Sequence, residues 1–203
     1  MSNPLRLILA SGSAARKHML DASGLVFDVI PADVDEDTIR SMMVTESDCV
    51  ESADVAAVLA MEKALAVSRL HPGALVIGSD QVLGLGRRMF SKAANKAEAR
   101  ETLDRLRGRT HELVSAVALA QAGAIVWQGF DSAQLTMRQF SDEFLGNYLA
   151  RAGDNFLRSV GCYELEGLGV QLFERIEGDY FTILGMPLLP LLAELRTRGV
   201  VTA

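Results

Sequence analysis

The sequence is poor in the residues that build metal clusters and disulfide frameworks. Its 203 residues include two cysteines and three histidines. Cys49 and Cys162 are far apart and have neither metal-ligand nor redox spacing, so we interpret both as free buried thiols. The histidines, His18, His71 and His111, are scattered without metal spacing, and we interpret them as structural or surface residues.

The chain also lacks an excess of positive charge and a long apolar run. A net charge of -6 argues against a nucleic-acid partner, because such binding needs a basic face. Any phosphate site must therefore be a local cluster of Lys and Arg, as is typical of small-molecule binding. The N-terminal MSNPLRLILA has no secretory pattern. The late segment 183–195 carries two prolines and is too short to span a bilayer. We therefore expect a cytoplasmic protein with neither nucleic acid nor membrane as partner.

The first half of the chain alternates between predicted strands and helices. No internal repeat, low-complexity tract or flexible linker is apparent, and the length suits one domain over 1–203. The polar segment 33–48 has no persuasive period and predicts no regular element. Ser52 is the predicted cap of a long helix that Pro72-Gly73 stops. The predicted strands are 5–10, 27–30 and 74–77, and the predicted helices are 14–22 and 52–70.

The second half contains a predicted hairpin between helices. Asn95 and Glu98 have capping-box spacing for a helix to about 106, and Ser141 opens another that ends near 153. A glycine-rich stretch with short strands follows, and then a helix over about 188–198. The hairpin joins 113–120 to 125–137 through Ala122-Gly123. Because strands and helices alternate early and a hairpin lies in the middle, the fold class is α/β with a mixed sheet, in two lobes around a cleft.

The first candidate site is the junction between the first predicted strand and helix, Ser11-Gly12-Ser13-Ala14-Ala15-Arg16. A helix N-terminus after a buried strand presents free N–H groups and the positive end of the helix dipole, which suits an anion. Gly12 permits close approach of the backbone, and Arg16 can reach back to phosphate oxygens. The alternative, favoured by this segment alone, is an ordinary serine cap beside a surface arginine.

Acidic residues supply two further candidates. Asp80 stands at the predicted C-terminal end of a buried strand, where the ligands of open α/β sheets gather. There it could bind a metal or act as a base, or alternatively cap a turn. The trio Asp35-Glu36-Asp37 could offer a carboxylate to Mg²⁺, a hard cation that takes oxygen ligands and phosphates. An acidic run is more often a solvated loop, and this segment alone favours that interpretation.

Two lysines and two glycine-rich acidic segments complete the candidates. Lys63 lies in an Ala-rich predicted helix, and Lys92 lies in a predicted loop. Each is equally compatible with an exposed lysine in a local ion pair. The segments 163–169 and 173–179 place glycines beside acidic residues, which indicates either backbone close to a ligand or ordinary turns.

Together these segments resemble the Maf family of nucleotide pyrophosphatases, which has been tied to septum formation in bacteria. The resemblance covers nearly the whole chain. Each motif is weak alone, but this many in the family's order is hard to obtain by chance. The motifs are LILASGSAAR (7–16), VDE (34–36), MEKA around Lys63, IGSDQV (77–82), Ser91-Lys92-Ala93, RGRTHE (107–112), EGLG (166–169), and FERIEGDY with GMPL (173–188).

The resemblance implies a mixed α/β fold with two lobes around a cleft, related to inosine-triphosphate pyrophosphatases, and a homodimer. It also implies hydrolysis of a nucleoside triphosphate to the monophosphate and pyrophosphate. Asp80 would be the proton acceptor and a metal ligand, and Glu36 a second carboxylate on Mg²⁺ or, alternatively, Mn²⁺. The residues implied to bind the triphosphate are Ser11, Arg16, Lys63 and Lys92. These types suit a reaction that must neutralise a polyanion and activate a water.

Three positions bear on the base. Gln81 and Glu166 stand where the uridine- and thymidine-type members have Thr and Gln, so the chain is similar to the subgroup that acts on 7-methyl-GTP. A carboxylate at 166 can accept from the two adjacent N–H donors of guanine, whereas uracil and thymine would present repelling carbonyls. Ala15 stands where that subgroup can place an aromatic residue, so a cationic base loses a stacking partner.

The chain departs from the family's usual pattern at two loops. It has Ser13-Ala14-Ala15-Arg16 in place of Ser-Pro-Arg-Arg, and Ser91-Lys92-Ala93 in place of Gly-Lys-Pro. Both changes bear on loop geometry more than on activity. The alternatives are a dTTP/UTP pyrophosphatase of the same family and a non-catalytic nucleotide-binding regulator of cell division. The retained charged set at 16, 36, 63, 80 and 92 favours an enzyme.

Overall fold

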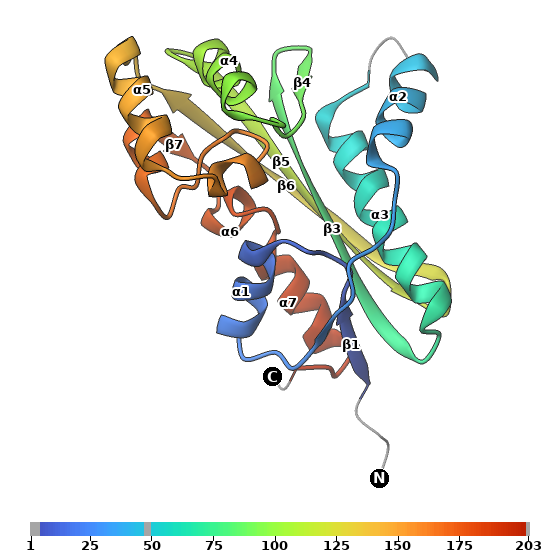
Figure 1. Cartoon of the computed structure of the whole chain (residues 1–203). Helices are drawn as coiled ribbons and strands as arrows, with labels where there is room; N and C mark the ends of the chain where they lie inside the picture. The colour runs from blue at the N-terminus through green and yellow to red at the C-terminus, as the bar shows by residue number, and fades with distance from the viewer. Residues whose placement is uncertain (1–4, 47–49, 202–203) are drawn as a thin grey trace.

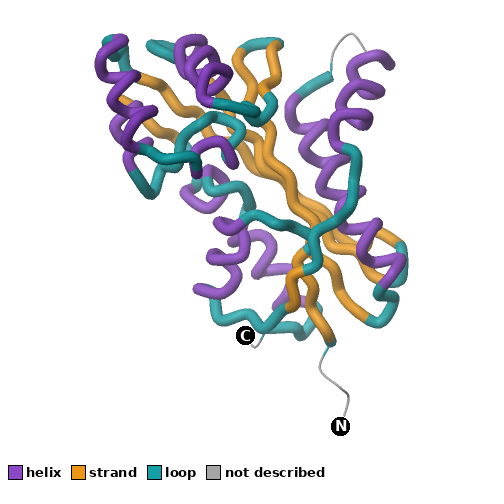
Figure 2. The backbone as a smooth tube through the Cα atoms, viewed as in Figure 1, coloured by secondary structure: helices purple, strands orange, loops and turns teal. Residues whose placement is uncertain are grey.

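The computed structural model describes residues 5–46 and 50–201, and within them one seven-stranded mixed sheet forms the centre of the fold (Figures 1 and 2). The strand order is β2-β1-β3-β5-β6-β7, and β4 pairs with β3. β1 is parallel to β2 and β3, and the other pairings are antiparallel. The strands are β1 (Arg6–Leu9), β2 (Asp28–Val29), β3 (Ala74–Leu85), β4 (Arg88–Phe90), β5 (Thr110–Gln121), β6 (Ala124–Met137) and β7 (Phe173–Glu177).

Helices cover both faces of the long strands β3, β5 and β6, which run through the whole molecule (Figure 1). On one face, α1 and α7 pack near β1, while α4 and α5 pack at the opposite end of the strands. These two groups form two lobes, and α3 covers the other face. The helices are α1 (Ala14–Ala22), α2 (Glu36–Glu46), α3 (Ser52–Leu70), α4 (Lys96–Leu106), α5 (Asp142–Arg151), α6 (Tyr180–Ile183) and α7 (Leu188–Thr197), with 3-10 turns at Asn155–Arg158 and Leu168–Leu172.

Strand β3 alternates strictly between the two faces, as the period of two in a β-strand requires. Ile77 and Leu83 belong to the apolar clusters of the two lobes, whereas Val82 packs with α3. Gly78 also faces α3, and a Cβ there would lie 2.2 Å from the carbonyl oxygen of Ala60. Glycine is therefore required at this position because the α3 backbone lies directly on the strand.

Several predicted elements are confirmed together with their local causes. Ser13 caps α1 by accepting from the Arg16 N–H at 3.4 Å, and Asn95 caps α4. The β5–β6 hairpin turns through Ala122 and Gly123, both at positive φ, which matches the right-handed twist of the strands. The mixed α/β fold class is thus confirmed.

Three predictions about local structure are wrong. Segment 33–48 contains α2, which begins where Asp35 accepts hydrogen bonds from the backbone and hydroxyl of Thr38. Ser52 is the first residue of α3 and not its cap, because Glu51 holds that position. β3 does not end before Asp80 but continues to Leu85.

The remaining predictions concern isolated residues. Cys162 is a free buried thiol, as predicted, and Cys49 lies outside the described residues. His111 is buried and His18 is exposed. Over the described ranges, none of the helices is both long and apolar enough to cross a membrane.

Candidate active site

A cleft of about 1250 Å³ opens along one edge of β3, between the two lobes. β1 pairs with β3 only as far as Ile77, and β4 begins its pairing at Leu83. Across 78–82 this edge of β3 pairs with no strand in the described part of the chain. Side chains on both faces of the strand can therefore reach the same cleft.

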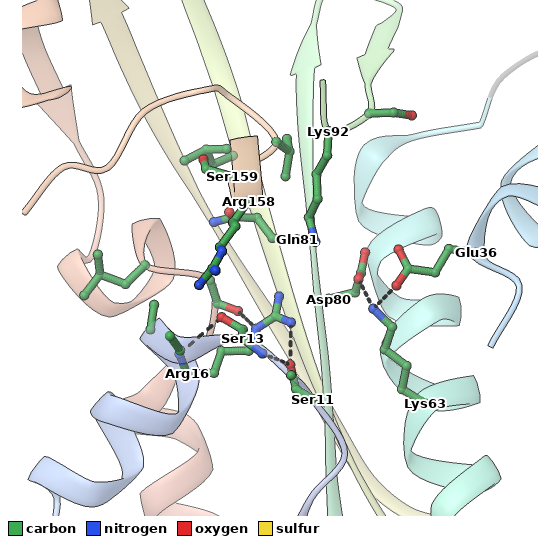
Figure 3. A pocket seen from close by; sticks show the side chains of 18 of the residues that line it. Ser11, Ser13, Arg16, Glu36, Lys63, Asp80, Gln81, Lys92, Arg158 and Ser159 are labelled. Carbon is green, nitrogen blue, oxygen red and sulfur yellow. Dashed lines mark hydrogen bonds and ion pairs between the residues drawn. The ribbon is translucent and has the colours of Figure 1, made fainter. Parts of the chain in front are cut away.

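Asp80 lies at the centre of this bare edge and takes part in a buried charge cluster. It comes from β3 and is only 4 % exposed. Lys63 of α3 lies with its ammonium 2.6 Å from Asp80 Oδ1 and 2.6 Å from Glu36 Oε1 (Figure 3). Lys63 is thus buried and ion-paired between two carboxylates, which rules out the interpretation as an exposed lysine in a local pair.

Electrostatics holds Glu36 in its charged form. Burial alone raises the pKa of Glu36, but the hydrogen bond from Lys63 and the charges of Lys63, Lys92 and Arg40 outweigh it. The net result is a pKa below the usual value. Because α2 presents Glu36 in its first turn, the acidic trio begins a helix and is not a solvated loop.

The α1 side of the cleft holds the serine–arginine loop. Arg16 is buried and donates from Nε to the Gly185 carbonyl at 2.8 Å and from Nη1 to Ser11 Oγ at 3.2 Å (Figure 3). Burial lowers the pKa of Arg16, while Asp80 and Glu36 act in the opposite direction. The arginine remains a cation because its unperturbed pKa is so high. It therefore anchors the loop while contributing positive charge to the cleft.

The carboxylates of the site are of the type that a hard divalent cation takes. Glu36 and Asp80 both contact the Lys63 ammonium, so two carboxylates from two elements lie close together, and the Glu36 side chain is 39 % exposed. Among the described residues no group of three or more His, Cys, Asp or Glu forms a metal cluster. Two carboxylates nevertheless suffice for Mg²⁺, which takes its remaining ligands from water and substrate phosphates.

The predicted base-reading residues lie around the other side of β3. The two N–H groups of Gln81 Nε2 point to Ser115 Oγ and the carbonyls of Thr182 and Ile183, all 3.0–3.1 Å from the nitrogen. Its own carbonyl oxygen is the group left to accept from a ligand. Glu166 is exposed in the loop between the 3-10 turns Asn155–Arg158 and Leu168–Leu172, and its Oε1 lies 3.4 Å from the Tyr180 hydroxyl. Both Glu166 and Ala15 line the cleft.

Comparisons with known proteins show the family to which the chain belongs. The sequence matches the family described as "Maf-like protein" over residues 6–198. The chain belongs to the Maf family. A 7-methyl-GTP pyrophosphatase of Mesorhizobium japonicum is 50% identical over 196 residues, which is 97% of this chain and 98% of the relative. A nucleoside triphosphate pyrophosphatase of Bradyrhizobium diazoefficiens is 53% identical over 195 residues, or 96% and 95% of the two chains. A solved HAM1 protein from Coxiella burnetii gives a TM-score of 0.42 at 17% identity, over 66% of this chain and 73% of that one.

Several residues in the Maf cleft were not predicted from the sequence. Arg40 binds Asp80 across 40 positions, and nothing in the local pattern indicates it because α2 itself was missed. Arg158, at the end of the 3-10 turn Asn155–Arg158, and Ser159 line the cleft after α5, and Figure 3 shows the Arg158 side chain pointing toward the loop of Ser13 and Arg16. Lys92 itself lies in a loop after β4, as predicted.

His111 is a buried support of this Maf site. Its Nε2 lies 2.8 Å from the hydroxyl of Tyr163, a cleft residue, and its Nδ1 is buried without a partner in the described part of the chain. Burial lowers the pKa of His111 from 6.5 to about 4. The folded chain therefore keeps this histidine neutral at a pH where the unfolded chain protonates it.

This histidine predicts a loss of stability on acidification. Above pH 6.5 His111 is neutral in both the folded and the unfolded chain, and the free energy of unfolding has its full value. As the pH falls from about 6.5 toward about 4, only the unfolded chain gains a proton at this residue, so the free energy of unfolding decreases. Between about pH 7 and 5 the free energy of unfolding should fall by roughly 2 kcal/mol on this account. Urea titrations at several pH values should show a flatter dependence for His111→Gln, but not for the control His18→Gln. Equal pH dependence in the wild type and His111→Gln would contradict the assignment.

Proposed function

We propose that this nucleoside triphosphate pyrophosphatase of the Maf family acts on 7-methyl-GTP, releasing pyrophosphate and the monophosphate, with Asp80 as the proton acceptor. The observation that carries the proposal is the position of Asp80. It is a buried carboxylate at the edge of a cleft lined by cations, with Lys63 2.6 Å from one of its oxygens. Such a group can take a proton from the attacking water while the cations offset the charge on the phosphates.

Placement in the cleft supports the remaining roles that we propose. Ser11 and Arg16 offer a hydroxyl and a cation at the start of α1, where an anion is favoured. Lys63 and Lys92 offset triphosphate charge from the α3 and β4 sides. A divalent metal, Mg²⁺ or Mn²⁺, held by Glu36 and Asp80 would supply further neutralisation of the phosphate oxygens.

Support for a guanine base comes from the acceptors that the cleft offers. Gln81 has its amide nitrogen engaged by the protein and therefore offers a carbonyl oxygen. Glu166 offers a carboxylate that suits both adjacent guanine donors and the positive charge of a 7-methylated ring. Uracil and thymine would place carbonyl oxygens against it. Ala15 lines the cleft without an aromatic ring, so we expect weaker discrimination than a stacked site would give.

The experiment that tests the substrate is Glu166→Gln with a panel of nucleotides. We expect the wild type to prefer 7-methyl-GTP over UTP and dTTP, and Glu166→Gln to narrow or reverse that preference by about ten- to hundredfold, because a mismatched polar group costs about 1–3 kcal/mol. The measurement is kcat/KM for 7-methyl-GTP, GTP, UTP and dTTP by pyrophosphate release.

Glu174→Gln is the matched control, since Glu174 is an exposed glutamate in β7 that lies outside the cleft lining. It should leave the ratios unchanged. A wild type that favours UTP or dTTP would show that Glu166 does not read the base as proposed. That result would leave the assignment of pyrophosphatase activity unchanged.

A further inference from the structure

Arg40 occupies the second oxygen of the Asp80 carboxylate. Its Nη2 lies 3.1 Å from Asp80 Oδ2, while Lys63 occupies Oδ1. The side chains of Arg40 and Asp80 are 20 % and 6 % exposed, so this ion pair is largely removed from water. Both oxygens of the carboxylate are therefore bonded to cations of the protein.

Helix α2 brings this arginine and the other acidic residue of the site together. Glu36 and Arg40 are four residues apart on α2, so they share one face of the helix. Glu36 is bonded to Lys63, and Arg40 is bonded to Asp80. Two carboxylates and two cations thus alternate between α2, α3 and β3.

A guanidinium on Asp80 Oδ2 and a metal ion on the same oxygen compete, because like charges at one oxygen repel each other. Arg40 lines the cleft, so its guanidinium has another partner within the same space when a triphosphate is present. Arginine pairs with phosphate as readily as with carboxylate, through the same donors.

We propose that Arg40 is a positioning residue that competes with the divalent metal for Asp80 and moves to the triphosphate when metal and nucleotide bind together. The inference rests on the proposed function, because it takes Asp80 and Glu36 as metal ligands. It follows that the free protein binds metal weakly and that nucleotide strengthens metal binding. By linkage, metal strengthens nucleotide binding by the same factor.

The test compares Arg40→Ala with the wild type in two measurements. Mn²⁺ alone is titrated into nucleotide-free protein, by calorimetry or by the paramagnetic signal of free Mn²⁺. Arg40→Ala should bind Mn²⁺ about tenfold more tightly, because one charge-assisted competitor is gone. At saturating metal, the same variant should raise KM for the best substrate of the panel by about tenfold, because a phosphate partner is lost.

The two effects have opposite signs, and a merely structural defect would weaken both. Arg40→Lys should fall between the wild type and Arg40→Ala in both measurements. Arg6→Ala is the matched control, since it removes an arginine from an exposed pair with Asp28 and makes the same change in net charge. It should alter neither quantity.

Each outcome separates this inference from the proposed function. Unchanged or weaker Mn²⁺ binding by Arg40→Ala, with Asp80→Asn defective in Mn²⁺ binding, would overturn the role of Arg40 alone. The same holds if Arg6→Ala behaves like Arg40→Ala. If Asp80→Asn binds Mn²⁺ as the wild type does, Asp80 is not a metal ligand, and both the inference and that part of the proposed function fall.

Discussion

Asp80→Asn is expected to reduce pyrophosphate release by about a thousandfold while the chain stays folded, because a positioned general base contributes roughly 10²–10⁴ in rate. An amide has nearly the shape of the carboxylate but cannot take a proton from water, and it binds metal poorly. Its oxygen can still accept from Lys63, which preserves one of the two contacts. Initial rates of pyrophosphate release, together with circular dichroism of the same sample, would measure both quantities.

Asp28→Asn is the matched control for this variant. Asp28 is also paired with an arginine, but the pair is exposed and lies outside the cleft lining. We expect full activity from it. A folded Asp80→Asn protein with wild-type turnover would remove Asp80 from the chemistry, and the cleft would then need another proton acceptor.

Lys63→Ala is expected to affect both stability and activity. It removes the ammonium between Asp80 and Glu36, so two carboxylates are left facing one another with less compensation. Removing one partner of a buried ion pair lowers the free energy of unfolding by about 3–5 kcal/mol. The lower end of this range applies here because the Glu36 side chain can turn toward water. We expect kcat/KM to fall by more than about a hundredfold, since the charge that orients the carboxylates is also lost.

Denaturant unfolding and steady-state kinetics of Lys63→Ala would be compared with two other lysine variants. Lys17→Ala removes a lysine from an exposed pair with Asp21 and should change neither quantity. Lys92→Ala removes an exposed cleft cation, so it should raise KM and leave stability unchanged. If Lys63→Ala behaved like Lys17→Ala, the buried lysine would have no part in the site.

Local signals in the sequence predicted the elements that they cap or terminate. Ser13 and Asn95 begin helices as expected, and Ala122-Gly123 turns the hairpin. Helix α2 was missed because its residues are mostly polar and its start depends on a single cap at Asp35. It is held by apolar contacts of Ile39 and Met43 with the α3 cluster and by ion pairs to Lys63 and Asp80, and no local window contains these distant partners.

The placement of Asp80 shows a second limit of local reading. The run Gly78-Ser79 resembles the end of a strand, but both small residues are required by close neighbours within it. Gly78 lies against the α3 backbone, and the single Ser79 O–H lies between two carbonyl acceptors, those of Ala116 at 2.8 Å and Gly185 at 3.0 Å. Contacts with residues far away in the sequence therefore decide whether the strand continues through these residues, which the local composition leaves open. The pairing of Arg40 with Asp80 likewise depends on residues that are distant in the sequence.

The alternation of β3 separates two tasks within one pair of neighbours. Asp80 faces α3 and the charge cluster, whereas Gln81 faces α6 and the region proposed for the base. If the proposed roles hold, residue 81 can be exchanged during evolution, and the choice of nucleotide altered, while the residues proposed for hydrolysis on the opposite face are left intact. Insertion or deletion of one residue in this strand would exchange the two faces and lose both functions together. Divergence among such enzymes should accordingly proceed by substitution at this point and never by a change of length.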